Sequence, residues 1–298
     1  MPLLKNLSKN MQKIINWLQI LLSDPRRIFE FFKNKILWKI VTYFSMKYKL
    51  SIVYRHILWF EIFLSGKNNI VEQEVVLKWW FEDYLVNFYA RNLQNDSIFF
   101  DIGCNFGLFS LIGWFKIKDW IIYSFDADIN MINLIDKSVT LNKYKNISII
   151  NTAVSSEDGF IDFNIVDDPA FNSIGKVEGY KLLKKIHIPS IKLDSFIQDK
   201  NLSKIDFIKI DIEGAELSAL KWWESLLKKF KPILSIEVSE KTFSVFGYSS
   251  KDLINYMQSL DYIVYNYRSS ILEKEIIQQE YLYDNLIFIH KDSQLIIL

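Results

Sequence analysis

The stretch Phe99–Gly107, Phe-Phe-Asp-Ile-Gly-Cys-Asn-Phe-Gly, decides the fold that the sequence predicts. It begins with apolar residues, contains one acid and ends with two of the chain's nine glycines. This pattern predicts a buried strand that turns into a helix. Glycine lets a ligand approach the backbone at such a turn, and the following helix offers free N–H groups to an anion. We therefore expect a binding loop that contains Asp101, Gly103, Asn105 and Gly107.

Further short apolar runs alternate with helix-like segments from Asn95 onward. Nearly continuous apolar strands separated by helices predict an α/β domain with a mostly parallel sheet, covered on both faces. The runs that we expect to form strands are Ser97–Ile102, Trp120–Phe125, Ile147–Asn151, Ile205–Ile210, Pro232–Val238, Tyr262–Tyr267 and Leu286–His290.

The composition excludes several classes of protein. The chain has 298 residues, of which 50% are hydrophobic, and this fraction excludes a disordered chain. The single cysteine, Cys104, excludes a disulfide framework and a cysteine-rich zinc site. The longest run without a charged residue, Ile102–Phe115, has 14 residues, whereas a membrane-spanning helix needs roughly 20. We expect a cytoplasmic protein without a secretory signal.

A second acid, Asp126, follows the next predicted strand, 19 residues after Gly107. That spacing is close to the spacing of about 20 residues for an acid that binds ribose hydroxyls. Leu108 stands near the place where a dinucleotide site needs its third glycine, so a pyrophosphate is disfavoured. A turn suited to a carboxylate, together with an acid suited to a ribose diol, predicts S-adenosylmethionine as the ligand. Asn151 and Ala153, after the third strand, are the expected neighbours of its adenine.

Four segments resemble the FkbM-type methyltransferases. They are Asp101–Gly107, Phe125-Asp126, Ile188–Ser195 and Lys209–Glu216, the last reading Lys-Ile-Asp-Ile-Glu-Gly-Ala-Glu. The resemblance extends from about Asn95 to His290. It implies a Rossmann-like class I fold with a mostly parallel, seven-stranded sheet, S-adenosylmethionine as methyl donor, and a sugar or glycolipid hydroxyl as acceptor. The chain departs from the family pattern where Asp126-Ala127 replaces the usual Glu-Pro and where Cys104 replaces a common alanine.

The segment Lys209–Glu216 carries the side chains that we expect to act on the acceptor. A strand and turn here would bring its polar groups to the carboxyl edge of the sheet, beside the first loop. A hydroxyl acceptor must lose its proton, and a positioned base typically accelerates such a step by about 10²–10⁴-fold. Asp211 is the first candidate for base or substrate anchor and Glu237 the second, while Lys209 would pair with one of them or favour a developing alkoxide.

Two other residues are candidate substrate ligands, Glu213 from this segment and His56 from the N-terminal part. The carboxylates of Asp211, Glu213 and Glu237 could alternatively hold a divalent cation, since hard cations take oxygen ligands. We assign no metal site from the sequence.

Residues 1–50 differ from the rest of the chain in charge. They carry ten Lys or Arg against two acids, a net charge of +8, so the remainder sums to −7. Their apolar residues recur at helical spacing, which predicts a basic helical extension. It either packs on the main domain or contacts an anionic membrane surface peripherally. Residues 51–94 then form a lead-in with a short strand over His56–Leu64 and a helix over about Glu72–Arg91, and residues 95–298 form the methyltransferase domain.

Three other functions remain as alternatives at this stage. A nucleotide-binding oxidoreductase is disfavoured by the missing third glycine, and a non-catalytic scaffold docked through residues 1–50 is disfavoured by Asp101, Asp126 and Asp211. A nucleic-acid methyltransferase would use the basic segment, but the acidic body argues against a polyanion across the active-site face. Neither the acceptor nor the oligomeric state follows from the sequence.

Overall fold

The computed structural model describes residues 52–55, 60–65, 69–78, 81–176, 179–268 and 270–294. The chain divides into two compact units, one ending at Phe81 and one beginning at Glu82. In the first unit, β1 (Ile52–Arg55) pairs antiparallel with β2 (Glu61–Leu64), and α4 (Ile70–Lys78) follows. The predicted basic extension, residues 1–50, lies outside the described residues.

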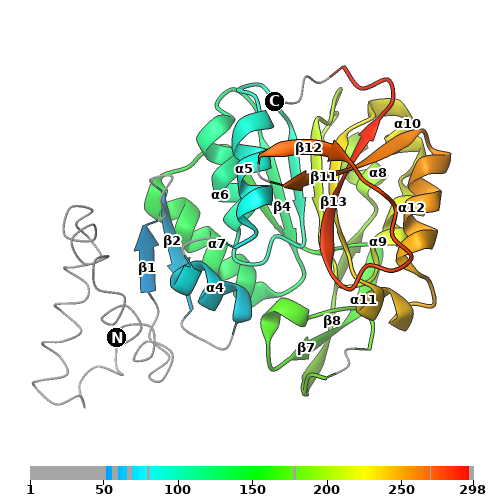
Figure 1. The fold of residues 1–298 in the computed structure, drawn as a ribbon. Helices are drawn as coiled ribbons and strands as arrows, with labels where there is room; N and C mark the ends of the chain where they lie inside the picture. Colours follow the sequence, from blue (N-terminus) through cyan, green and yellow to red (C-terminus); the bar gives the residue numbers. More distant parts are fainter. Residues whose placement is uncertain are drawn as a thin grey trace, which may run out of the picture. The chain divides into compact units, whose positions relative to one another are not determined.

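The second unit contains an α/β sheet of eight strands, which Figure 1 shows with helices on both faces. The strand order is β12-β11-β13-β10-β9-β3-β4-β5. Five strands are parallel: β3 (Phe99–Ile102), β4 (Ile122–Asp126), β5 (Ile147–Asn151), β9 (Phe207–Ile210) and β10 (Ile233–Val238). The other three pair antiparallel: β13 (Asp284–His290), β11 (Tyr262–Arg268) and β12 (Ile271–Lys274).

The mostly parallel α/β fold that the sequence predicted is therefore confirmed, with one strand more than expected. The prediction of seven strands was wrong because β12 adds an edge strand through a tight turn after β11. Ser270, in that turn, has the left-handed φ of 63° that short hairpin turns require.

Helices cover the sheet from both sides. The list in chain order is α5 (Asp83–Asn92), α6 (Leu108–Lys116), α7 (Ile129–Asn142), α8 (Leu193–Asp199), α9 (Glu216–Trp222), α10 (Glu224–Phe230), α11 (Glu240–Val245) and α12 (Ser250–Ser259). The apolar side chains of α8, α9, α10 and α12 pack with those of β3, β9 and β10 in one buried cluster. On the opposite face, Tyr89 of α5 contacts Phe99 and Phe207 at ring-centroid distances of 4.9 and 6.3 Å.

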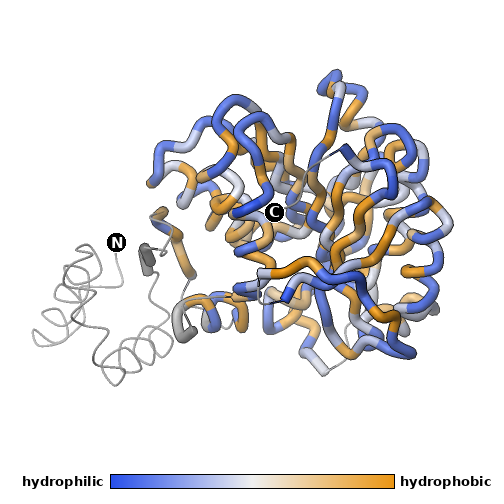
Figure 2. The backbone as a smooth tube through the Cα atoms, turned by 45° about the horizontal axis from the view of Figure 1, so that its top comes forward, coloured by the Kyte–Doolittle hydropathy of each residue, from blue (hydrophilic) through white to orange (hydrophobic). Residues whose placement is uncertain are grey.

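The period of two along each strand separates these faces. Phe100 and Ile102 belong to the apolar cluster, as do Ile208 and Ile210 on the neighbouring strand. The residues between them, such as Asp101, face the other way. Figure 2 shows hydrophobic segments running through the interior of the unit and hydrophilic ones on its outer loops.

One helix prediction was wrong. The expected helix over Glu72–Arg91 is interrupted, because α4 ends at Lys78 and Glu82 has a left-handed φ of 49° that cannot continue a right-handed helix. A similar break at Trp223, whose side chain is buried in the core cluster, separates α9 from α10.

A small second sheet was also not anticipated. The strands β6 (Ala153–Val154), β8 (Leu182–Ile191) and β7 (Gly159–Val166) form it, in that order. A short 3-10 helix, η1 (Pro169–Phe171), lies between β7 and β8. This sheet extends from the end of β5 and supplies one wall of the pocket described next.

Candidate active site

The loop after β3 crosses the carboxyl ends of its two neighbouring strands. The N–H groups of Gly103 and Cys104 both donate to the Phe125 carbonyl, at 3.0 and 2.9 Å. Gly103 has a φ of +76°, and a Cβ added there would lie 1.7 Å from the Asp211 carbonyl oxygen. Only glycine fits this position, because both the conformation and the contact exclude a side chain.

Asp126, at the end of β4, faces this loop. Its Oδ2 accepts the Asn105 N–H at 2.8 Å, and its Oδ1 accepts the Asp128 N–H at 2.8 Å. These bonds fix the carboxylate while each oxygen keeps a second lone pair. Burial is the largest influence on its pKa and raises it to about 7.

One pocket contains both the loop after β3 and Asp126. Among the predicted residues, Gly103, Asn105, Asp126, Ala153, Asp211 and Glu213 line it. The sequence analysis missed a second group of lining residues, which comes from the end of β5 and from the β7–η1 region: Thr152, Phe163, Pro169, Ala170, Asn172 and Ile174. Asn172 is held by its Oδ1, which accepts the Val166 N–H, and by its Nδ2, which donates to Asp128.

Three predicted cofactor residues lie outside the lining of this pocket. Asp101 is fully buried below it and accepts a hydrogen bond from Ser110, while its Oδ1 has no partner. Gly107 precedes α6, where a Cβ would lie 2.3 Å from the Ile135 side chain. Asn151 donates through Nδ2 to the Asp126 carbonyl at 3.0 Å. The structure therefore places these residues where they support the loop and the β4 end from behind.

Lys209 and Asp211 form a buried ion pair at the end of β9. The Lys209 Nζ lies 2.8 Å from Asp211 Oδ2, and the lysine side chain is 3% exposed. Burial alone would lower the pKa of Lys209, but the carboxylates of Asp211 and Asp101 raise it above its usual value. Burial opposes ionisation of Asp211 in turn, yet Lys209 keeps the pKa of this carboxyl below its ordinary value. Asp211 is thus the ionised acid of the site.

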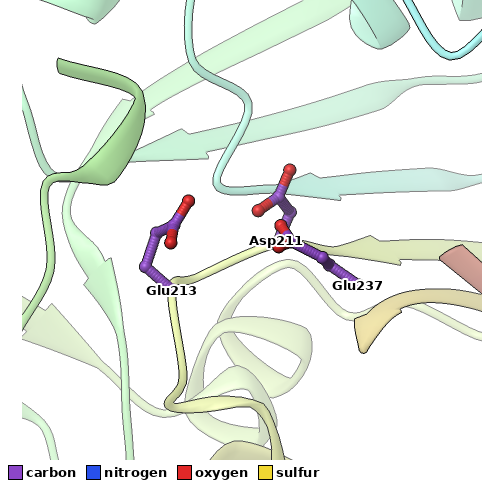
Figure 3. A group of neighbouring side chains, drawn as sticks. All are labelled: Asp211, Glu213 and Glu237. Atoms are coloured by element: carbon purple, nitrogen blue, oxygen red, sulfur yellow. The ribbon is translucent and has the colours of Figure 1, made fainter. Parts of the chain in front are cut away.

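Glu213 and Glu237 join Asp211 in a cluster of three carboxyl groups (Figure 3). One oxygen from each lies within 4.8 Å of the others. Burial raises the pKa of both glutamates well above the ordinary value, and the charge of Asp211 raises it further. Burial and the charge of Asp211 therefore favour the protonated form of Glu237, whereas Lys209 favours the ionised form of Asp211. The same three oxygens are of the kind that a hard divalent cation takes.

His56, the remaining predicted site residue, lies outside the described residues. The predicted polar residues Asn105, Asp126, Asp211 and Glu213 lie together at one edge of the sheet, where β3 and β9 are neighbours. The chain continues from β3 toward β4 and β5 but returns to β9 and β10 on the other side. This reversal opens the crevice in which α/β sheets bind their ligands.

The family model of the methyltransferase FkbM domain matches residues 101–264 of this chain, more than half of its length. The chain belongs to the FkbM methyltransferase family. S-Adenosylmethionine is the methyl donor of this family. No curated protein matches the sequence.

Solved structures similar to this chain include three methyltransferases. The FkbM methyltransferase from Methylobacillus flagellatus is 17% identical, with a TM-score of 0.43, and the match covers 74% of this chain and 52% of that one. The chain thus spans about half the length of that relative. A putative methyltransferase from Streptococcus mutans, in complex with SAH, is 14% identical over 70% of this chain and 95% of that one, with a TM-score of 0.41. TrmK from M. capricolum, also in complex with SAH, is 17% identical over 70% and 68%, with a TM-score of 0.40.

The residues that line the pocket of this chain fit S-adenosylmethionine. Asp126 offers two carboxylate oxygens for a ribose diol, and Phe163, Pro169 and Ile174 offer apolar contacts for a purine. The donor supplies a methyl group on a sulfonium centre, and the pocket leads from Asp126 to Asp211, where an acceptor would meet it.

Replacing Gly103 by alanine should abolish binding of S-adenosylmethionine. The new Cβ would collide with the Asp211 carbonyl and force the loop and β9 apart. Isothermal titration calorimetry measures the loss, with Gly247→Ala as the matched control, because Gly247 has the same φ of +76° but nothing lies within 4 Å of a Cβ there. Wild-type affinity in Gly103→Ala would contradict the assigned position of the loop.

Replacing Asp126 by asparagine should weaken S-adenosylmethionine binding about ten- to a hundredfold at pH 8, because charged hydrogen bonds to the ribose are lost. The wild-type affinity should rise as the pH increases through about 7, where Asp126 ionises in the empty site. Calorimetry from pH 6 to 8 gives the ratio of the wild-type affinity to the Asp126→Asn affinity at each pH. Because the ligand titrates equally in both measurements, the ratio reports the contribution of Asp126 alone. A ratio that is constant with pH would contradict this role.

Chelation should leave methyl transfer intact. Lys209 already places a cation inside the acidic cluster, which reduces its need for a metal ion. Methyl transfer measured after EDTA treatment tests this. Loss of transfer that Mg²⁺ restores would instead identify Asp211, Glu213 and Glu237 as metal ligands.

Proposed function

We propose that this protein transfers the methyl group of S-adenosylmethionine to a hydroxyl group of a sugar, glycan or glycolipid. The observation that supports it is the ionised Asp211, held by Lys209 at the end of the cofactor pocket. A hydroxyl acceptor needs a base at this point, and the described chain provides one that a neighbouring cation keeps charged. The class of acceptor follows the resemblance to FkbM-type enzymes.

The reaction is an in-line displacement at the sulfonium methyl. The acceptor oxygen forms its bond to the methyl carbon while the carbon–sulfur bond breaks, and the hydroxyl proton passes to Asp211. The raised pKa of Glu237 favours its protonated form in the resting site, so Asp211 precedes it as the base. Lys209 favours the negative charge that develops on the acceptor oxygen as its proton leaves. Positioning of the two reacting atoms supplies much of the remaining acceleration.

Replacing Asp211 by asparagine should reduce kcat by about 10²–10⁴-fold, because the base is lost. The affinity for S-adenosylmethionine should change by only a few-fold. The matched control is Asp199→Asn, since Asp199 forms a similar ion pair with Lys200 at 2.9 Å, but on the exposed surface. Unchanged turnover in Asp211→Asn would exclude Asp211 as the base.

The acceptor class is tested by mass spectrometry. Isotopically labelled S-adenosylmethionine is incubated with the purified protein and with glycan and glycolipid fractions of a cell extract, with Asp211→Asn as the inactive reference. We expect the label on a sugar hydroxyl. Label only in nucleic acid, or only in small molecules without a sugar, would contradict the proposed acceptor.

Residues 1–50, with their net charge of +8, are proposed to contact anionic membrane surfaces. No helix in the described part of the chain is both long and apolar enough to span a bilayer. The full chain should sediment with vesicles that contain phosphatidylserine and detach as the salt concentration rises. Equal binding to purely zwitterionic vesicles would contradict an electrostatic contact.

A further inference from the structure

Glu82, which was not among the residues predicted for the site, has an unfavourable backbone conformation at the start of a helix and yet does not cap that helix. It is the N-cap residue of α5, where an acid commonly accepts hydrogen bonds from the first helical N–H groups. Here the side chain makes no capping bond, and the backbone has the left-handed φ of 49°. Such a conformation is unfavourable for a residue other than glycine. The Glu82 side chain is therefore directed to something other than the helix.

The first oxygen of the carboxylate is firmly held by β13 and the residue before it. Glu82 Oε1 accepts a hydrogen bond from the Tyr283 hydroxyl and another, at 2.6 Å, from the Asn285 amide. Asn285 also donates to the Tyr84 hydroxyl at 3.2 Å. These bonds fix the orientation of the carboxylate, and with it the position of the second oxygen.

The second oxygen, Glu82 Oε2, is buried and has no hydrogen-bond partner. It lies near the catalytic cluster, because Asn285 is the register partner of Glu237 in the β10–β13 pair. The pKa of Glu82 reflects the same neighbourhood: burial raises it to about 7, the charge of Lys209 opposes this rise, and that of Asp211 adds to it. A buried acceptor without a donor is unfavourable and calls for an explanation.

We propose that Glu82 is a ligand of the acceptor, and that its Oε2 accepts a hydrogen bond from a second hydroxyl group beside the one that is methylated. This inference rests on the proposed function, and it narrows the acceptor to compounds with neighbouring hydroxyl groups. Asp211 would take the proton of the reacting hydroxyl, while Glu82 orients the acceptor from the β13 side. No bond to Glu82 forms or breaks during transfer.

A carboxylate oxygen selects for such a ligand. A site built to pair with a hydroxyl rejects a compound that lacks it, because the buried oxygen then remains unpaired. A hydrogen bond from the acceptor to this oxygen should increase the affinity for the acceptor about ten- to a hundredfold. Tyr283, which holds the other oxygen of the carboxylate, is itself half exposed, so a rotation of its side chain would open a path from solvent to the buried Oε2.

The first measurement needs no acceptor. If Oε2 is unpaired in the free enzyme, Glu82→Gln should raise Tm by about 2–4 °C at pH 8, because a buried charge whose second oxygen lacks a donor is removed. The matched control is Glu275→Gln, since Glu275 also accepts a tyrosine hydroxyl, from Tyr281 at 3.0 Å, but lies outside the cluster. A lower Tm in Glu82→Gln would show that Oε2 already has a structural partner, and would overturn the proposal.

The second measurement uses the glycan fraction that the wild type methylates in the mass-spectrometric assay. Glu82→Gln should raise the apparent KM for that fraction about ten- to a hundredfold, leave kcat within a few-fold and leave S-adenosylmethionine binding unchanged. Tyr283→Phe, which keeps the carboxylate but frees its orientation, should raise KM less. A fall in kcat at constant KM, weaker cofactor binding, or wild-type kinetics would each overturn the proposal.

Failure of this inference is distinguishable from failure of the proposed function. If the wild type methylates no hydroxyl compound, the proposed function fails first, and the Tm comparison still decides whether Oε2 is free. If the wild type methylates a glycan and Glu82→Gln does so with an unchanged KM, only the role of Glu82 fails.

Discussion

The buried ion pair between Lys209 and Asp211 is the interaction on which the site depends. A lysine that is 3% exposed is tolerable only because carboxylates surround it. It lowers the pKa of Asp211, while burial and the charge of Asp211 raise the pKa of the neighbouring Glu237 and Glu213. Without this cation, the carboxyl groups near the end of β9 would each take up a proton or repel one another. The difference in pKa between Asp211 and the two glutamates would then be lost.

This pair belongs to a pattern that extends over four neighbouring strands. Each strand carries a polar residue two positions before its last functional residue: Asp101 before Gly103, Ser124 before Asp126, Lys209 before Asp211 and Ser235 before Glu237. The strand period of two puts both members of each pair on the same face. The inner row is buried, and hydrogen bonds such as Ser110 to Ser124 and Tyr89 to Ser235 satisfy part of it. The outer row reaches the edge of the sheet and forms the site.

The elements that could be predicted from the sequence are those that a local pattern defines, such as a continuous run of apolar residues. The interior strands were located to within a few residues because they are continuous apolar runs, and the convergence of Gly103, Asp126 and Asp211 followed from the parallel arrangement. The inner row of polar residues, which interrupts each apolar run at the same register position, also pointed to the site, but it was not used in the prediction. The strands β7 and β8 were missed because much of each faces solvent and lacks a continuous apolar run. Glu82 was missed because its importance depends on Tyr283 and Asn285, about two hundred residues later in the chain.

The two halves of the site are built differently, and the difference follows from their tasks. On the cofactor side, main-chain N–H groups hold Asp126 and a glycine fits against Asp211, so the geometry depends little on side-chain freedom. Two other acids, Glu82 near Lys209 and Glu213 in the pocket lining, both have left-handed backbones, with φ of 49° and 54°. Non-glycine residues in this conformation cost of order 1–3 kcal/mol each. A sequence selected for stability alone would place glycine or asparagine at both positions. Acids stand there instead, and Lys143 and Lys231 adopt the same conformation at helix ends, so it is the carboxyl groups and not the backbone that distinguish Glu82 and Glu213.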